Sequence, residues 1–159
     1  MMDLYHFTSP FHVLGCQREG LRLGMIPEHY EDISSGAIKI RLRPGFQWLT
    51  SNPNFDQSWA EGTGLLPYKR NAFRLTVRVP RRHQKHLFRW VKACIDFHQE
   101  TARALNAYGD PQNWWIFRGW IRPSWVVAID ENPKNAVPAQ DKINAQNFQR
   151  MYGKVVMVA

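Results

Sequence analysis

Cysteines and long apolar runs are scarce in this sequence. Cys16 and Cys94 are the two cysteines, and neither belongs to a CxxC or Cys/His motif, so we expect two buried or half-buried thiols. The six histidines show no metal-ligand spacing, and we expect no structural metal. No stretch approaches the ~20 apolar residues that cross a bilayer, and the segment after Met1 does not resemble a secretion signal. We therefore expect a cytoplasmic protein without membrane contact.

Common catalytic signatures are missing too: the sequence has no GxGxxG, P-loop, HExxH or GxSxG motif and no paired carboxylates at fixed spacing. Acidic residues are few, with 13 Asp and Glu against 21 Lys and Arg, for a formal net charge of +8. Such a surface attracts polyanions, and nucleic acid is the commonest of these. We expect a nucleic-acid partner, with an acidic protein partner as the alternative. Basic proteins that bind neither are also common.

The 159 residues fit one domain, 1–159, of the α+β class. The clearest strand spans residues 73–79, where Phe73, Leu75 and Val77 alternate with polar side chains. Further strands are expected at residues 3–8, 46–50, 114–117 and 125–129, the last two as a pair. Apolar residues at helical spacing predict one long amphipathic helix over residues 84–107. The expected fold is a single compact domain with a split antiparallel sheet and this helix.

Other segments have weaker signals. Residues 25–45 hold several turn residues, with apolar and basic residues alternating over 37–42, and we expect a flexible, basic and mostly loop-like insertion with an exposed strand in it. Ser9 and Pro10 resemble a helix cap followed by proline at the first helical position. A polar helix over 141–152 and an edge strand over 155–158 are expected near the end of the sequence.

Three short segments resemble the ADP-ribosyltransferase-like fold, in the order found in that family. Tyr5-His6-Phe7-Thr8, followed by a helix and then Gly20-Leu21, is similar to the opening of the DarT-type DNA ADP-ribosyltransferases and of the RNA 2'-phosphotransferases. Trp48-Leu49-Thr50 resembles the family's second strand, and the segment 119–123 with its Ile121-Arg122-Pro123 resembles its late turn. The resemblance covers about a third of the chain.

This resemblance implies an NAD-dependent ADP-ribosyltransferase-like enzyme acting on a nucleic acid or a nucleotide. It implies NAD contacts from one set of residues on the first strands and on the strand 73–79: Tyr5, His6, Thr8, Trp48, Thr50 and Arg74. The residues expected to act in catalysis are His6, Thr8 and Arg118. Nucleic-acid or phosphate contacts are expected from a cationic set: Arg78, Arg81, Arg82, Lys85 and Arg122.

One departure from the family bears on catalysis. Enzymes of this kind usually carry a Glu on a late strand to stabilise positive charge on the ribose, but residues 113–118 contain no acid, and Asp110 and Asp130 are the nearest. Either catalysis uses arginines, as the phosphotransferases do, or the protein is a non-catalytic basic binding protein, such as an inhibitor or accessory factor.

Ordinary structural roles compete with these assignments. His6 is equally well read as a core histidine, and the arginines on the strand 73–79 as a solvated cationic face. The basic run of residues 81–86 falls at the start of the expected long helix, where the helix dipole disfavours cations, which indicates either an anionic partner or simple solvation. The tryptophans at 114, 115, 120 and 125 either stack on bases or belong to the core.

Overall fold

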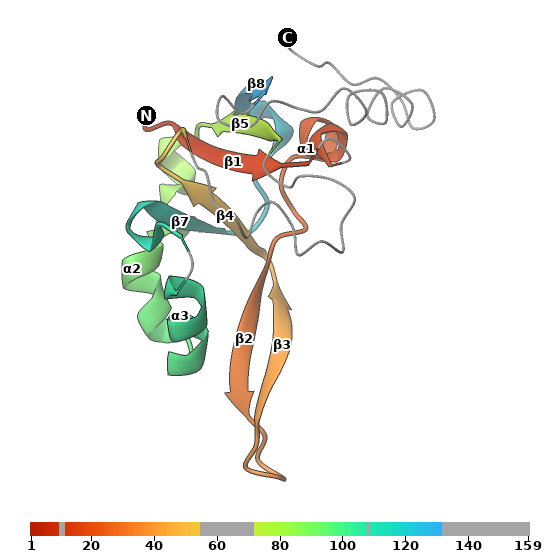
Figure 1. Cartoon of the computed structure of the whole chain (residues 1–159). Coiled ribbons are helices and arrows are strands. Elements are labelled where there is room, and N and C mark those ends of the chain that lie inside the picture. The colour runs from red at the N-terminus through yellow and green to blue at the C-terminus, as the bar shows by residue number, and fades with distance from the viewer. Residues whose placement is uncertain (10–11, 55–71, 108, 132–159) are drawn as a thin grey trace.

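The computed structural model describes residues 1–9, 12–54, 72–107 and 109–131 (Figure 1). The polar helix expected over 141–152, the strand expected over 155–158 and Pro10 lie outside them. The strands are β1 (Leu4–Thr8), β2 (Met25–Glu31), β3 (Ile38–Pro44), β4 (Phe46–Thr50), β5 (Phe73–Val77), β6 (Leu87–Arg89), β7 (Trp114–Arg118) and β8 (Val126–Glu131). The α-helices are α1 (Val13–Glu19), α2 (Trp90–Ala93) and α3 (Gln99–Asn106). Short 3-10 helices cover Arg81–His86, Cys94–Asp96, Pro111–Asn113 and Pro123–Trp125.

Six strands form one antiparallel sheet in the order β6-β7-β4-β1-β5-β8. β1 is an inner strand, as its sequence predicts, and it pairs with β5 along its whole length from Leu4↔Val77 to Thr8↔Phe73. With β4 it shares a single register pair, Tyr5↔Thr50. The sheet is therefore divided at this seam into the halves β6-β7-β4 and β1-β5-β8, and the α+β class is confirmed.

Apolar side chains cover both faces of the sheet, in two separate core clusters. Alternation in β5 places Phe73, Leu75 and Val77 in the first cluster. Other members come from β1, α1, β4, β7, β8 and the turns between elements: Leu4, Val13, Leu21, Leu49, Phe117, Ile121, Trp125 and Ile129 among them. The second cluster lies under α2 and the base of the β2–β3 hairpin: Ile26, Phe46, Trp90, Ala93, Phe97, Trp114 and Ile116. Trp114 and Trp125 are thus core residues, whereas Trp120 is about half exposed.

Residues 25–45 form a two-stranded hairpin, not a mostly loop-like insertion. β2 and β3 pair over seven positions from Met25↔Pro44 to Glu31↔Ile38, and the hairpin extends away from the six-stranded sheet (Figure 1). β3 corresponds to the exposed strand that its alternating sequence predicts. The sequence does not predict β2 as a strand because it contains Pro27, a residue that sheets tolerate at an edge.

The prediction of one long helix over residues 84–107 is wrong. This segment holds a 3-10 turn, the short strand β6, α2, a second 3-10 turn and α3. The chain is extended at Phe97, and α3 begins afresh at His98, whose ring accepts a hydrogen bond from the backbone N–H of Glu100. The expected pairing of the late strands with each other is also wrong, since β7 lies between β4 and β6 whereas β8 pairs with β5.

Candidate functional site

His6 lies at the seam where the two halves of the sheet meet. Its Nδ1 is 2.9 Å from the backbone carbonyl oxygen of Trp48 on β4. A carbonyl oxygen can only accept, so Nδ1 carries the proton and donates it. In the neutral ring Nε2 is then an acceptor, and no hydrogen bond reaches it from the described residues. The seam thus holds a histidine whose ring is oriented through Nδ1, with no donor to Nε2 in the described part of the chain.

The surroundings of His6 favour this neutral form. Burial lowers the pKa of the imidazole below its ordinary value of 6.5, the hydrogen bond to the Trp48 carbonyl opposes this in part, and the charge on His12 lowers the pKa further. The ring is therefore neutral at pH 7 and can accept a hydrogen bond from a hydroxyl or an amide N–H. It is not placed to donate one from Nε2.

The residues expected to contact NAD are divided between the two faces of the sheet. Cross-strand partners share a face, so the pairs Tyr5↔Thr50 and Phe7↔Arg74 place Tyr5, Thr50 and Arg74 on the face opposite His6 and Thr8. Thr50 accepts a hydrogen bond from the N–H of Asn52 in the turn after β4. These residues do not form a single surface around His6.

Arg74 and Arg78 both have partners within the protein. Nη1 of Arg74 donates to the Pro53 carbonyl at 2.9 Å, Nη2 lies 3.5 Å from Asp130, and the guanidinium lies 5.5 Å from the centre of the Tyr5 ring. Arg78 follows the end of β5 and forms a two-pronged ion pair with Asp3 on the surface, at 2.6 and 3.3 Å. Both arginines therefore already have hydrogen-bonding partners in the folded chain.

Two turns that are distant in sequence are joined by backbone hydrogen bonds. The N–H of Leu21 donates to the carbonyl of Ile121 at 2.9 Å, and the N–H of Ile121 donates to the carbonyl of Leu21 at 3.0 Å. The indole N–H of Trp120 donates to the Glu19 carbonyl at 2.6 Å. Gly20 has φ +73°, and a Cβ there would overlap the Ile121 carbonyl oxygen, so this junction requires glycine.

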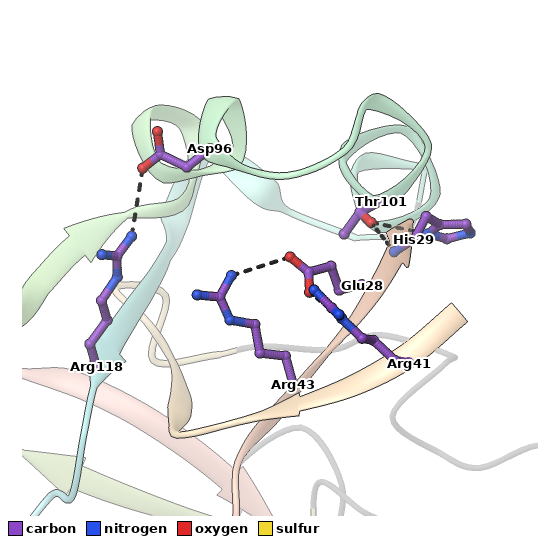
Figure 2. Close-up of polar contacts among 7 residues, drawn as sticks. All are labelled: Glu28, His29, Arg41, Arg43, Asp96, Thr101 and Arg118. Carbon is purple, nitrogen blue, oxygen red and sulfur yellow. Dashed lines mark hydrogen bonds and ion pairs between the residues drawn. The ribbon is translucent and has the colours of Figure 1, made fainter. Parts of the chain in front are cut away.

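Arg118 lies at the end of β7, beside an ion-pair group at the hairpin base (Figure 2). It pairs with Phe46, at the end of β4 opposite to the Tyr5↔Thr50 pair, and is therefore away from His6. Its guanidinium lies 4.7 Å from the centre of the Phe88 ring, and Nη2 is 3.6 Å from Asp96. Nearby, the buried carboxylate of Glu28 accepts hydrogen bonds from Arg41 at 2.9 Å and Arg43 at 3.2 Å. Arg118 therefore belongs to this group and does not act beside His6. No local pattern indicates a role for Glu28, because its partners come from the strand opposite.

A second group of cations lies around the 3-10 helix Arg81–His86. We call the side chains Arg81, Arg82, Lys85 and Arg122 the basic cluster. Within the described part of the chain none of them forms an ion pair with an acid. Desolvation lowers the pKa of the neighbouring His83, and the charges of Arg82, Arg122 and Lys85 lower it further. The run does not begin a long helix, so an unfavourable helix dipole does not apply to it.

Among the residues that the structure describes, no three His, Cys, Asp or Glu side chains are grouped so as to hold a metal ion. In the same part of the chain, no helix has the length and apolar character needed to cross a membrane. Comparison with family models, with curated proteins and with solved structures finds no match. The function is therefore inferred from the residues of this chain.

Proposed function

We propose that this protein is an NAD-dependent transferase of the ADP-ribosyltransferase type that acts on a nucleic acid or a nucleotide. The observation that carries the proposal is the neutral His6 at the seam, whose Nε2 accepts no hydrogen bond from the described residues. Its support is that the first segment of the family resemblance contacts each of the other two. His6 binds the Trp48 carbonyl, and Leu21 binds Ile121.

The proposal matches the hydrogen-bonding capacity of His6 to that of part of a dinucleotide. The ribose hydroxyls and the carboxamide N–H of NAD are donors, and the Nε2 of His6 is an acceptor held in place through Nδ1. Thr8 is buried on the same face, where its hydroxyl contacts the Cys16 thiol. When bound, NAD supplies an ADP-ribosyl group whose bond to nicotinamide is readily broken. In this proposal His6 orients the nicotinamide ribose, and Thr8 supports the strand beside it.

The two acids nearest in sequence to the expected position of the late Glu, Asp110 and Asp130, both have partners in the structure. Asp110 accepts from the side-chain amide of Asn113 at 2.6 Å, and Asp130 lies beside Arg74. Both acids thus have structural partners, and Arg118 is remote from His6. The proposal therefore assigns no residue to the stabilisation of the reacting ribose, and it does not choose between the transferase and the phosphotransferase chemistry.

The test is the thermal stability of the pure protein with and without NAD. A ligand at a hundred times its Kd stabilises the folded state by about 2.7 kcal/mol. The informative variant is His6→Asn, because its amide can still donate to the Trp48 carbonyl but offers nothing at the position of Nε2. We expect NAD to raise the Tm of the wild type and not that of His6→Asn.

The matched control is His29→Ala. His29 is also part-buried and its ring is also hydrogen-bonded once, to Thr101 at 3.0 Å, but it lies in the hairpin. This variant should keep the full NAD shift. An equal shift in His6→Asn would disprove the role of His6, and no shift in the wild type would remove NAD from the proposal.

A second candidate is a non-catalytic role in binding nucleic acid. It is favoured by the basic cluster, whose four cations have no acidic partner in the described residues. Such a surface releases counterions when phosphates bind, so affinity falls with salt. Trp120 lies next to it, about half exposed, with the Arg122 guanidinium 5.8 Å from its ring centre.

The test is the salt dependence of binding to a single-stranded oligonucleotide. We expect Arg82→Ala with Arg122→Ala to flatten the plot of log K against log salt by about 0.7 for each phosphate that the variant no longer neutralises. Arg78→Ala is the control, because Arg78 is already neutralised by Asp3. Salt-dependent binding without an NAD shift would favour the binding protein over the enzyme. Equal slopes in all variants would place the nucleic acid elsewhere.

A further inference from the structure

The hairpin register shows which backbone groups of β3 point outward. The N–H of Asp32 donates to the Ala37 carbonyl, and the N–H of Gly45 donates to the Gly24 carbonyl, so both ends of the ladder are hydrogen-bonded pairs. Such pairs alternate with non-bonded ones along antiparallel strands. Counting between the two ends, the odd-numbered residues of β3 bond to β2, and Ile38, Ile40 and Leu42 direct their N–H and C=O groups away from it.

The backbone groups along the outer edge of β2 already have partners or lack a donor. Pro27 has no N–H, the N–H of His29 donates to the Thr101 hydroxyl at 2.7 Å, and the Met25 carbonyl accepts from the Trp48 indole at 3.1 Å. Figure 1 shows α3 beside β2. The outer edge of β3 differs, because no strand, helix or side chain among the described residues binds the backbone groups of Ile38, Ile40 and Leu42.

The side chains along this edge alternate strictly in character. Ile38, Ile40 and Leu42 lie on one face and are 48%, 61% and 64% exposed. Lys39, Arg41 and Arg43 lie on the other face, with their side chains 52%, 60% and 49% exposed. Their partners Asp32 and Glu28 come from the β2 side of the hairpin. The β3 edge therefore presents an apolar stripe on one face and a cationic stripe on the other, where three cations are paired with only two carboxylates.

These charges select against a second copy of this chain as the occupant. If the outward residues of two antiparallel β3 strands bonded to each other, even-numbered residues would oppose even-numbered ones, and cations would oppose cations. Lys39 would lie opposite Arg41 of the other copy, or Arg41 opposite its equivalent. Like charges directly opposite one another destabilise a sheet. A strand with carboxylates in the same positions would instead meet the cationic stripe with opposite charge.

We propose that the outer edge of β3 binds an extended segment of a protein partner in which apolar and acidic residues alternate. The segment would add a third strand to the hairpin, with its backbone bonded to Ile38, Ile40 and Leu42. Its apolar side chains would cover the exposed stripe, and its carboxylates would lie beside Lys39, Arg41 and Arg43. Main-chain bonds supply affinity and alternate side chains supply specificity in this mode of recognition. The inference is independent of NAD binding.

The experiment uses a capped heptapeptide of alternating valine and glutamate, with a valine–lysine heptapeptide as the comparison. Fluorescence anisotropy measures the affinity, and amide hydrogen exchange measures protection of the hairpin. We expect saturable binding of the glutamate peptide, at least about tenfold weaker binding of the lysine peptide, and slower exchange at Ile38, Ile40 and Leu42. Failure of the glutamate peptide to bind, or equal binding of the two peptides, would overturn the proposal.

Variants separate the β3 edge from the rest of the hairpin. Ile40→Pro removes an outward N–H without removing a bond to β2, and should weaken peptide binding at least about tenfold. If this variant fails to fold, Lys39→Glu provides the second test. It should weaken binding of the glutamate peptide and strengthen binding of the lysine peptide. Ile33→Thr, at the fully exposed hairpin tip, is the control and should bind like the wild type. Dimerisation of the wild type that Ile40→Pro abolishes would overturn the assignment of an acidic partner.

Discussion

Replacing Gly20 with alanine tests the junction between the two turns. Gly20 has φ +73° and ψ −160°, a region open almost only to glycine and costing another residue about 1–3 kcal/mol. A Cβ there would overlap the Ile121 carbonyl oxygen and lie 2.9 Å from the backbone nitrogen of Pro123. The two Leu21–Ile121 hydrogen bonds would then separate, at about 1 kcal/mol each.

The sum predicts that Gly20→Ala lowers the free energy of unfolding by about 3–5 kcal/mol, a large part of the 5–15 kcal/mol that a domain usually has. Urea denaturation followed by tryptophan fluorescence measures it. The matched control is Gly36→Ala, because Gly36 also has positive φ, +67°, but a Cβ there meets nothing within 4 Å. It should lose only about 1–2 kcal/mol.

A second control, Gly15→Ala, lies within α1 with open space around it, and alanine should stabilise the protein by about 0.5–1 kcal/mol. The reasoning about the junction would be refuted if Gly20→Ala were no more destabilising than Gly36→Ala. That result would mean that the two turns separate without cost, and that their contact gives no support to the proposed function.

Three further predictions concern single side chains. Burial holds the pKa of His6 in the folded protein below 6.5, so its contribution to the free energy of unfolding should be complete above pH 6.5 and be lost as the pH falls through the folded pKa. In denaturation experiments from pH 7.5 to 5, the free energy of unfolding should therefore decrease more steeply for the wild type than for His6→Asn. Equal slopes for the two proteins would contradict this prediction. Burial raises the pKa of Cys16 to about 11, so iodoacetamide at pH 7.5 should modify Cys94 first, as peptide mass spectrometry would show; faster labelling of Cys16 would disprove its protection. Trp90→Phe should lower the free energy of unfolding by about 2–3 kcal/mol, because the fully buried indole donates to Asn106 at 2.6 Å, and a loss below about 1 kcal/mol in urea denaturation would count against this.

Five of the six strands of the main sheet are predicted from the sequence, and β6 is not, because it lies within the expected long helix. Burial of one face of a strand leaves a period of two in the sequence. In β5 the alternation of Phe73, Leu75 and Val77 with polar residues predicts both the strand and its buried side chains. The same rule predicts β3, although both its faces are exposed, because the apolar and basic residues still alternate.

The prediction of one helix over residues 84–107 is wrong for a physical reason that periodicity alone does not contain. Apolar residues at helical spacing need only reach the same core. Here Trp90 and Phe97 pack on each other with ring centres 5.8 Å apart, although Phe97 is itself the extended residue that interrupts the helical segments. The break at Phe97 leaves little local signal, because His98 is an unusual helix cap.

The individual strands of the candidate site could be predicted from the sequence, but which of their residues share one face of the sheet could not. The central place of β1 followed from its sequence, but the face shared by Tyr5, Thr50 and Arg74 depends on register between strands, which no local pattern specifies. The ion pairs Asp3–Arg78 and Glu28–Arg41 join residues of different elements for the same reason. Only the contacts made in the folded state distinguish these paired arginines from those of the basic cluster.

The central position of β1 has a consequence for synthesis of the chain on the ribosome. β1 is the first described strand to emerge, but its partners extend to Val77, and the strand beyond them, β8, ends at Glu131. Chain synthesis proceeds at about 5–20 residues per second, so the apolar side chains of β1 stay unpaired for several seconds before β5 has been synthesised. During that interval they are open to chaperones and to non-native pairing, so this fold is expected to mature late in translation.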